Sequence, residues 1–169
     1  MSEQKPLRVL FVCHGNICRS PAAEGAFKHL IQEREMLSRF VVDSAGTSSF
    51  HIGERPHPDT RRAAREKGVT LDSLARQFEV EDFDKFDWIF AMDHKNLSDL
   101  LSMARSDADR KKVVLFRTFD PQRESDPIPD VPDPYYGGFA GFQDVQRIVM
   151  RTAENILDFV LSGKTTVPK

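Results

Sequence analysis

Apolar and polar residues along this chain follow two alternating periods, one typical of buried strands and one typical of amphipathic helices. Residues 8–13 are apolar or β-branched almost throughout, which predicts a strand buried on both faces. A helix is predicted directly after it, because Ser20 can cap a helix and Pro21 suits a first turn. The apolar stripe of this helix consists of Ala23, Phe27, Leu30 and Ile31.

The same alternation continues to the end of the chain. Further strands are predicted at residues 40–46, 86–92 and 113–116. Helices are predicted from Pro58 to Gly68, around Leu97–Ala104 and around Phe142–Val160. Strands that alternate with helices imply right-handed crossovers and a parallel sheet. The predicted fold class is therefore α/β, with one four-stranded parallel sheet that carries helices on both faces and is Rossmann-like or flavodoxin-like.

One aperiodic stretch interrupts this pattern. Residues 120–141 contain five prolines together with several aspartates and glycines, and a loop of this length in a compact domain is usually functional or disordered. No internal repeat or linker divides the chain. A single domain over residues 1–169 is expected, with residues 7–162 structured and residues 163–169 frayed.

Composition narrows the classes of function. The 169 residues include 24 Lys plus Arg and 26 Asp plus Glu, for a net charge of -2, which argues against binding nucleic acid by bulk charge. The longest apolar runs, residues 9–13 and 88–92, are far shorter than the ~20 residues that cross a bilayer. The first six residues lack the apolar segment of a secretory signal. We therefore expect a cytoplasmic protein that binds neither nucleic acid nor membranes.

The cysteines and histidines do not predict a metal site. Only Cys13 and Cys18 are present, so neither a disulfide framework nor a four-cysteine zinc site is expected. The five histidines show no ligand spacing. The two thiols are expected to be free and reactive.

The segment Cys13–Ser20 lies between the first predicted strand and the first predicted helix, at a sheet end where ligands bind in open α/β folds. Gly15 and Asn16 tolerate the left-handed backbone of a loop that wraps its N–H groups around an anion. Arg19 offers a planar fork that matches two phosphate oxygens. Positive potential there favours a thiolate at Cys13, which makes it a candidate nucleophile.

Residues Val12–Glu24 resemble the signature of the low-molecular-weight protein tyrosine phosphatases. Further matching motifs follow in order, at Asp43–Thr47, Ala75–Gln77, Met92–Asp93 with Asn96, and Asp133–Gly137. The resemblance thus extends over nearly the whole chain. It implies a hydrolase that acts on a phosphotyrosine protein or a small aryl phosphate ester without a cofactor, as a monomer or weak homodimer.

The resemblance also implies roles for particular residues. Cys13 is the expected nucleophile, Arg19 binds the phosphoryl group, and Asp133 is the general acid and base. The residues expected to line or support the anion loop are His14, Gly15, Asn16, Ile17, Cys18, Ser20 and Ser44. The expected walls of the substrate cleft are Ile17, Phe50, Tyr135 and Tyr136. Composition alone does not choose among the loop acids Asp120, Asp126, Asp130 and Asp133.

Two positions depart from the family pattern. Phe50 stands where relatives often have Trp or Tyr, so an aromatic wall is kept without a polar contact. Ser73 stands where relatives often have a histidine that supports the loop. Two roles are open for Cys18. It could form a protective disulfide with Cys13 under redox regulation, or it could pack beneath the loop.

Three other activities are considered. A protein-arginine phosphatase of the same fold is the main alternative, and relatives of that kind tend to have Thr where this chain has Ile17. An arsenate reductase needs further cysteines downstream, and none follows Cys18. A phosphocysteine carrier needs neither Arg19 nor Asp133, and both are present.

Overall fold

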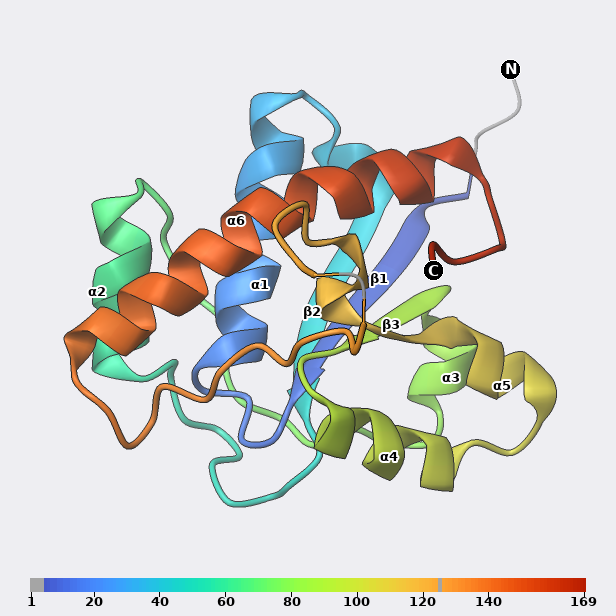
Figure 1. Cartoon of the computed structure of the whole chain (residues 1–169), viewed down its shortest axis with the longest axis horizontal. Coiled ribbons are helices and arrows are strands. Elements are labelled where there is room, and N and C mark those ends of the chain that lie inside the picture. The colour runs from blue at the N-terminus through green and yellow to red at the C-terminus, as the bar shows by residue number, and fades with distance from the viewer. Residues whose placement is uncertain (1–4, 125) are drawn as a thin grey trace.

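A four-stranded parallel sheet forms the centre of the molecule, as predicted from the alternation of strands and helices (Figure 1). We describe it from a computed structural model, which covers residues 5–124 and 126–169. The strands are β1 (Leu7–Cys13), β2 (Phe40–Gly46), β3 (Trp88–Ala91) and β4 (Val113–Leu115). Their order in the sheet is β2-β1-β3-β4, so β1 has neighbours on both sides and its carboxyl end lies at the centre of that edge.

Within residues 5–124 and 126–169, six α-helices and two short 3₁₀-helices connect and cover the strands. They are α1 (Arg19–Glu33), η1 (Leu37–Arg39), α2 (Pro58–Glu66), α3 (Asp82–Lys85), α4 (His94–Met103), α5 (Asp107–Lys112), η2 (Phe116–Phe119) and α6 (Phe139–Ser162). Among the described residues, no helix is long and apolar enough to cross a membrane. The expectation about a secretory signal concerns in part residues 1–4, which lie outside the described residues.

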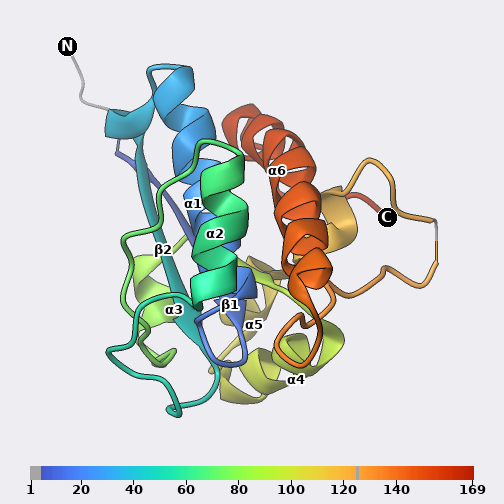
Figure 2. The same cartoon turned by 90° about the vertical axis from the view of Figure 1, so that its left-hand side faces the viewer.

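The sheet is covered on both faces, with a separate apolar core on each (Figure 2). Along β1, Val9 and Phe11 pack into the core that α1 and α6 cover, whereas Leu10 and Val12 pack into the core beneath α3 and α4. Neighbouring residues of a strand point to opposite faces, so a strand between two cores is apolar at every position. This is why residues 9–13 form an unbroken apolar run.

Two predicted helix boundaries have different outcomes. Ser20 does not cap α1, because the helix begins at Arg19 after Cys18, and the Ser20 hydroxyl instead contacts the Cys13 sulfur. Gly68 does end its helix as expected. It has a left-handed φ of +77°, and its N–H donates to the carbonyl of Arg65.

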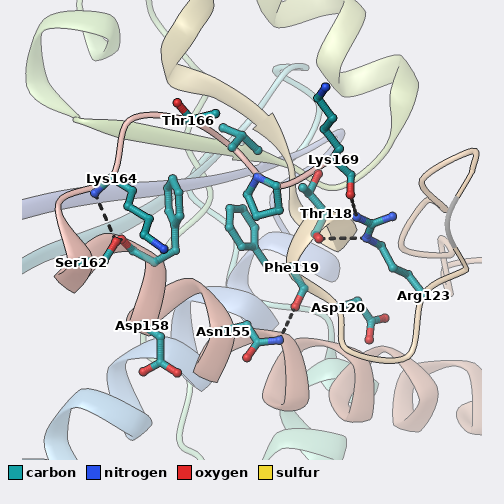
Figure 3. Close-up of a pocket in the computed structure, with 13 residues that line it drawn as sticks. Thr118, Phe119, Asp120, Arg123, Asn155, Asp158, Ser162, Lys164, Thr166 and Lys169 are labelled. Carbon is teal, nitrogen blue, oxygen red and sulfur yellow. Dashed lines mark hydrogen bonds between the residues drawn. The ribbon is translucent and has the colours of Figure 1, made fainter.

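Residues 163–169, which we expected to fray, lie against η2 and α6 without forming a helix or strand (Figure 3). Val167 packs against the larger core, and Arg123 Nη2 donates to the Lys169 carbonyl at 2.8 Å. The tail, η2 and α6 enclose an open cavity of about 860 Å³. The partly buried Val167 and the hydrogen bond from Arg123 are the contacts that attach this tail to the domain.

The long loop between η2 and α6 is anchored at its first residue, Asp120. This carboxylate is fully buried and accepts hydrogen bonds from Arg117 at 2.9 Å and from Arg151 at 2.8 and 2.9 Å. Burial alone would raise the pKa of Asp120, but the hydrogen bonds from Arg151, the Gln122 N–H and Arg117 outweigh it and lower the pKa. The charged form of Asp120 therefore joins the loop to α6.

We predict that Asp120→Asn lowers the free energy of unfolding at pH 7 by about 3 kcal/mol, because it removes one partner of a buried ion pair. The folded-state pKa of Asp120 lies below its ordinary value of 3.8. The stabilisation is therefore present above pH 3.8 and is lost as the pH falls through the folded-state pKa. Urea unfolding at a series of pH values measures both effects.

Asp158→Asn, at a carboxylate that is 72% exposed, is the control and should change the free energy of unfolding by less than about 0.5 kcal/mol. An equal loss in both variants would contradict the anchoring role.

Candidate active site

The loop between β1 and α1 turns sharply at the carboxyl end of the sheet, beside the end of β2. Thr47 N–H donates to the Cys13 carbonyl at 2.9 Å, and Ser48 N–H donates to the His14 carbonyl at 3.0 Å. A Cβ atom on Gly46 would lie only 2.7 Å from the His14 carbonyl oxygen, so this close approach requires glycine. The sequence places Gly46 in a motif, but only the structure shows that it holds the two loops together.

Asn16 sets the shape of the loop. Its φ is +57°, a left-handed conformation that residues other than glycine rarely adopt, and its side chain is buried. The amide Nδ2 donates to Ser20 Oγ at 2.8 Å and to Ser44 Oγ at 2.9 Å. Its Oδ1 accepts the Arg76 N–H at 3.0 Å. These three hydrogen bonds fix the orientation of the amide and hold the strained backbone in place.

A buried carboxylate that the sequence analysis missed supports this network from behind. Ser44 Oγ donates to Glu24 Oε1 at 2.5 Å, and Lys28 Nζ donates to Glu24 Oε2 at 2.6 Å. Burial lowers the pKa of Lys28, but the hydrogen bond and the charge of Glu24 raise it more, so the net shift is upward. The available signal was the spacing of Glu24 and Lys28, because residues four apart on a helix are neighbours. The cation that pairs with Glu24 is therefore Lys28, on the same helix.

Cys13 lies at the floor of a cleft, with its sulfur between two hydrogen-bonding groups. Asn16 N–H donates to Sγ at 3.3 Å, and Ser20 Oγ lies 3.0 Å from Sγ. Ser20 Oγ accepts the Asn16 amide, and its own hydrogen can point to the sulfur or to the Ala45 carbonyl oxygen at 3.4 Å. The Asn16 N–H, together with the Ser20 hydroxyl when it donates to Sγ, provides the hydrogen bonds that a nucleophilic thiolate needs.

Arg19 is buried beside Cys13, at the first position of α1. Its Nη1 donates to Asp93 Oδ2 at 2.6 Å and to the Val131 carbonyl at 3.1 Å. Burial lowers the pKa of the guanidinium, but Cys13 and the two acids Asp93 and Asp133 raise it overall. Asp93 and Val131 were not singled out as contacts from the sequence, although Asp93 belongs to the Met92–Asp93 motif.

Geometry distinguishes the four acids of the long loop. Asp133 lines the cleft, and its Oδ2 lies 3.8 Å from Arg19 Nη2. Asp120 is held in its buried ion pair, Asp130 accepts hydrogen bonds from the backbone and ring of His94, and Asp126 is exposed. Of these four, Asp133 is the acid that the fold brings to Cys13 and Arg19.

The cleft has a volume of about 450 Å³. Its lining consists of Cys13, His14, Gly15, Ile17, Cys18, Arg19, Phe50, His51, Asp133, Tyr135 and Tyr136. Asn16, Ser20 and Ser44, which we expected at the site, lie behind the loop and support it. His51 was not expected in the cleft. Its Nδ1 contacts Glu54 Oε2 at 2.6 Å, and its ring lies close to Gly15.

Cys18 lines the cleft but is buried, in a cluster with Ala63, Ala75 and Phe142. Burial raises the pKa of its thiol to about 12, although a hydrogen bond with Thr60 opposes the shift. Cys18 is therefore a protonated thiol at neutral pH, which favours its role in packing beneath the loop.

Within residues 5–124 and 126–169, no three His, Cys, Asp or Glu side chains are grouped to hold a metal ion.

Comparisons with known proteins agree with this geometry. A family model described as low molecular weight phosphotyrosine protein phosphatase matches residues 8–165. A relative of that description from Schizosaccharomyces pombe is 40% identical over 154 residues, which are 90% of this chain and 96% of the relative. A structure of a protein tyrosine phosphatase from Entamoeba histolytica has a TM-score of 0.87 at 38% identity and covers 93% of this chain and 98% of its own. A structure of a drosophila arginine phosphatase has a TM-score of 0.81 at 35% identity, with 90% and 97% covered.

Proposed function

This chain belongs to the low molecular weight phosphotyrosine protein phosphatase family, and from that premise we propose that it hydrolyses phosphotyrosine in proteins and small aryl phosphates. One observation supports this most strongly. One cleft of about 450 Å³ is lined by a sulfur that accepts the Asn16 N–H and lies 3.0 Å from the Ser20 hydroxyl, by a buried arginine and by a carboxyl group. These are the nucleophile, the anion-binding group and the proton donor that displacement at phosphorus requires.

The reaction has two steps. In the first, the Cys13 sulfur attacks phosphorus and forms an S–P bond, while the P–O bond to the aryl group breaks and Asp133 gives its proton to the leaving oxygen. Arg19 and the N–H groups of the loop bind the charge on the phosphoryl oxygens. In the second step, Asp133 accepts a proton from water as the water oxygen attacks phosphorus. The S–P bond breaks, inorganic phosphate leaves, and Cys13 returns as a thiolate.

The function is tested by hydrolysis of phosphotyrosine, phosphoserine and phosphoarginine peptides of one sequence. We expect phosphotyrosine to be the best substrate of the wild type. Cys13→Ser should abolish turnover, because a serine hydroxyl is far less acidic than a thiol and Ser20 is not a base. Phosphate release by the variant above the uncatalysed level would contradict the role of Cys13.

A second variant tests the acid. Asp133→Asn should reduce kcat by about 10²- to 10⁴-fold for phosphotyrosine, whose phenolate leaves poorly without a proton. The reduction should be much smaller for aryl phosphates whose phenolates are weak bases. Rates along a leaving-group series measure the difference. Asp130→Asn, at a residue bonded to His94, is the matched control. A uniform loss along the series would remove Asp133 from the role of acid.

A protein-arginine phosphatase is the second candidate, because a drosophila arginine phosphatase is 35% identical to this chain. Ile17, which lines the cleft, argues for phosphotyrosine. Its apolar side chain offers no acceptor to guanidinium N–H groups, and an unpaired buried donor costs about 1–3 kcal/mol. Ile17→Thr should therefore shift the kcat/KM ratio toward phosphoarginine by roughly tenfold or more. A wild type that already prefers phosphoarginine would establish the second candidate instead.

Redox control of the nucleophile is a further part of this proposal. Peroxide is expected to oxidise the Cys13 thiolate to a sulfenic acid. Attack by the Cys18 sulfur on that sulfenic acid forms a Cys13–Cys18 disulfide, breaks the S–O bond and releases water. Because Cys18 is a thiol at neutral pH, this step should accelerate as the pH rises toward 12. Recovery by dithiothreitol after peroxide treatment, compared between wild type and Cys18→Ser, measures protection. Equal recovery in both would leave Cys18 with a packing role alone.

A further inference from the structure

His57 connects the loop that carries the nucleophile with the loop that carries the acid. Its backbone N–H donates to the Ile17 carbonyl at 2.7 Å, and its ring contacts the ring of Tyr135. We propose that His57 is a positioning residue, whose ring holds Tyr135 in place as the wall against which the aryl group of the substrate packs. This inference rests on the proposed function and adds to it a residue that does not itself line the cleft.

The ring of His57 is fixed by contacts with two helices. Its Nδ1 accepts the Asp59 N–H at 3.0 Å and so caps the first turn of α2. The ring also stacks on Phe142 of α6, with the ring centroids 4.7 Å apart and an angle of 25° between the planes. Phe142 is buried in the cluster that contains Ile17 and Cys18. Since α2 and α6 lie side by side, one imidazole ring reaches both helices (Figure 2).

Tyr135 meets the His57 ring edge-to-face. The two centroids lie 5.9 Å apart and the planes form an angle of 74°, an arrangement that aromatic pairs favour. His51 and Tyr136 also lie near the Tyr135 ring, but Tyr136 is 92% exposed and His51 pairs with the exposed Glu54. Of these three neighbours, His57 is the one whose ring stacks on a buried side chain. A side chain as exposed as that of Tyr135 changes rotamer freely unless such a neighbour restricts it.

The wall can be separated from the acid, because different atoms hold them. Tyr135 N–H donates to Asp133 Oδ1 at 3.1 Å, while Asp133 Oδ2 lies 3.8 Å from Arg19 Nη2. Neither contact involves the His57 ring. Loss of that ring should therefore weaken binding of the aryl group and leave the proton transfer by Asp133 in place.

The choice of residue at this cap supports the same role. The usual residues that cap a helix are Ser, Thr, Asp and Asn, and none of them has a ring. Any of these could accept the Asp59 N–H as His57 does. What histidine adds is the ring that contacts Phe142 and Tyr135.

The experiment separates the two properties of the His57 side chain. His57→Asn keeps an acceptor for the Asp59 N–H and removes the ring, whereas His57→Phe keeps a ring and removes the acceptor. Binding of inorganic phosphate and of phenylphosphonate to the full chain is measured by calorimetry, together with kcat and KM for para-nitrophenyl phosphate. Phosphate reports on the loop around Cys13 and Arg19, and phenylphosphonate adds the contact with the wall.

We expect His57→Asn to weaken phenylphosphonate binding and to raise KM by about threefold or more, with kcat and phosphate binding changed less than about twofold. His57→Phe should bind phenylphosphonate within about twofold of the wild type, although its Tm is lower because the cap is lost. Tyr135→Ala should also weaken phenylphosphonate binding. Addition of His57→Asn to Tyr135→Ala should cause no further loss, because His57 acts through Tyr135.

Two variants serve as matched controls. His29→Asn removes an imidazole from α1 ten residues after Arg19, about 15 Å along the helix, and should leave binding of both ligands unchanged. Ser106→Ala removes the cap of α5 and should lower Tm without a change in binding.

Three results would each overturn the inference: equal weakening of phosphate and phenylphosphonate by His57→Asn, a His57→Phe variant as defective as His57→Asn, or additive losses in the double variant. The effect would then come from the loop around Cys13, from the helix cap, or from a route that bypasses Tyr135. A wild type that binds both ligands but hydrolyses neither aryl phosphates nor phosphotyrosine would overturn the proposed function, while the binding measurements would still decide the role of His57.

Discussion

The site depends on one side-chain amide, that of Asn16, which keeps a short loop in a conformation that its backbone does not favour. This left-handed residue in the middle of the loop donates its own N–H to the Cys13 sulfur at the floor of the cleft, where we propose that the phosphoryl group binds. Asn16 reaches Ser20, Ser44 and Arg76 at once, and so ties the loop to α1, to β2 and to the segment after α2. Breaking any one of these contacts leaves a buried polar group unpaired, so the arrangement is stable only as a whole.

The order of the strands explains why the residues that make these contacts lie close together. β1 lies between β2 and β3, so the residues that follow all three strands lie at one edge of the sheet. Ser44 and Gly46 end β2 beside the loop, and Asp93 follows β3 and holds Arg19. The loop that carries Asp133 is drawn to the same edge by Val131, whose N–H donates to the Met92 carbonyl and whose own carbonyl accepts from Arg19. The position of Asp133 thus depends on the same edge of the sheet as the position of Cys13.

The sequence predicted the elements that have a clear apolar period or a recognisable motif. It did not predict short helices or contacts between residues far apart in the chain. The sheet, its helices on both faces and the loop between Cys13 and Ser20 were predictable, because each has its own apolar period or flanking motif. Helices α3 and α5 have four and six residues, too few for a helical period to be visible. The fold of the C-terminal tail depends on Val167 and Arg123, which are far apart in the sequence. Among the site residues, Glu24 and Asp93 were missed because each acts through a partner that only the folded chain brings near.

Charge at the floor of the cleft links binding to catalysis. Arg19 is surrounded by Asp93, Asp133 and the Cys13 sulfur, so its single positive charge is already shared among acidic groups. In the mechanism proposed above, Asp133 gives its proton to the leaving oxygen and is then left as the carboxylate that the second step needs as a base. Its Oδ2 lies 3.8 Å from Arg19 Nη2, so the proposed acid and the proposed anion-binding group face the same space above Cys13. Both proposed tasks of Asp133 therefore take place beside the phosphoryl group that Arg19 would bind.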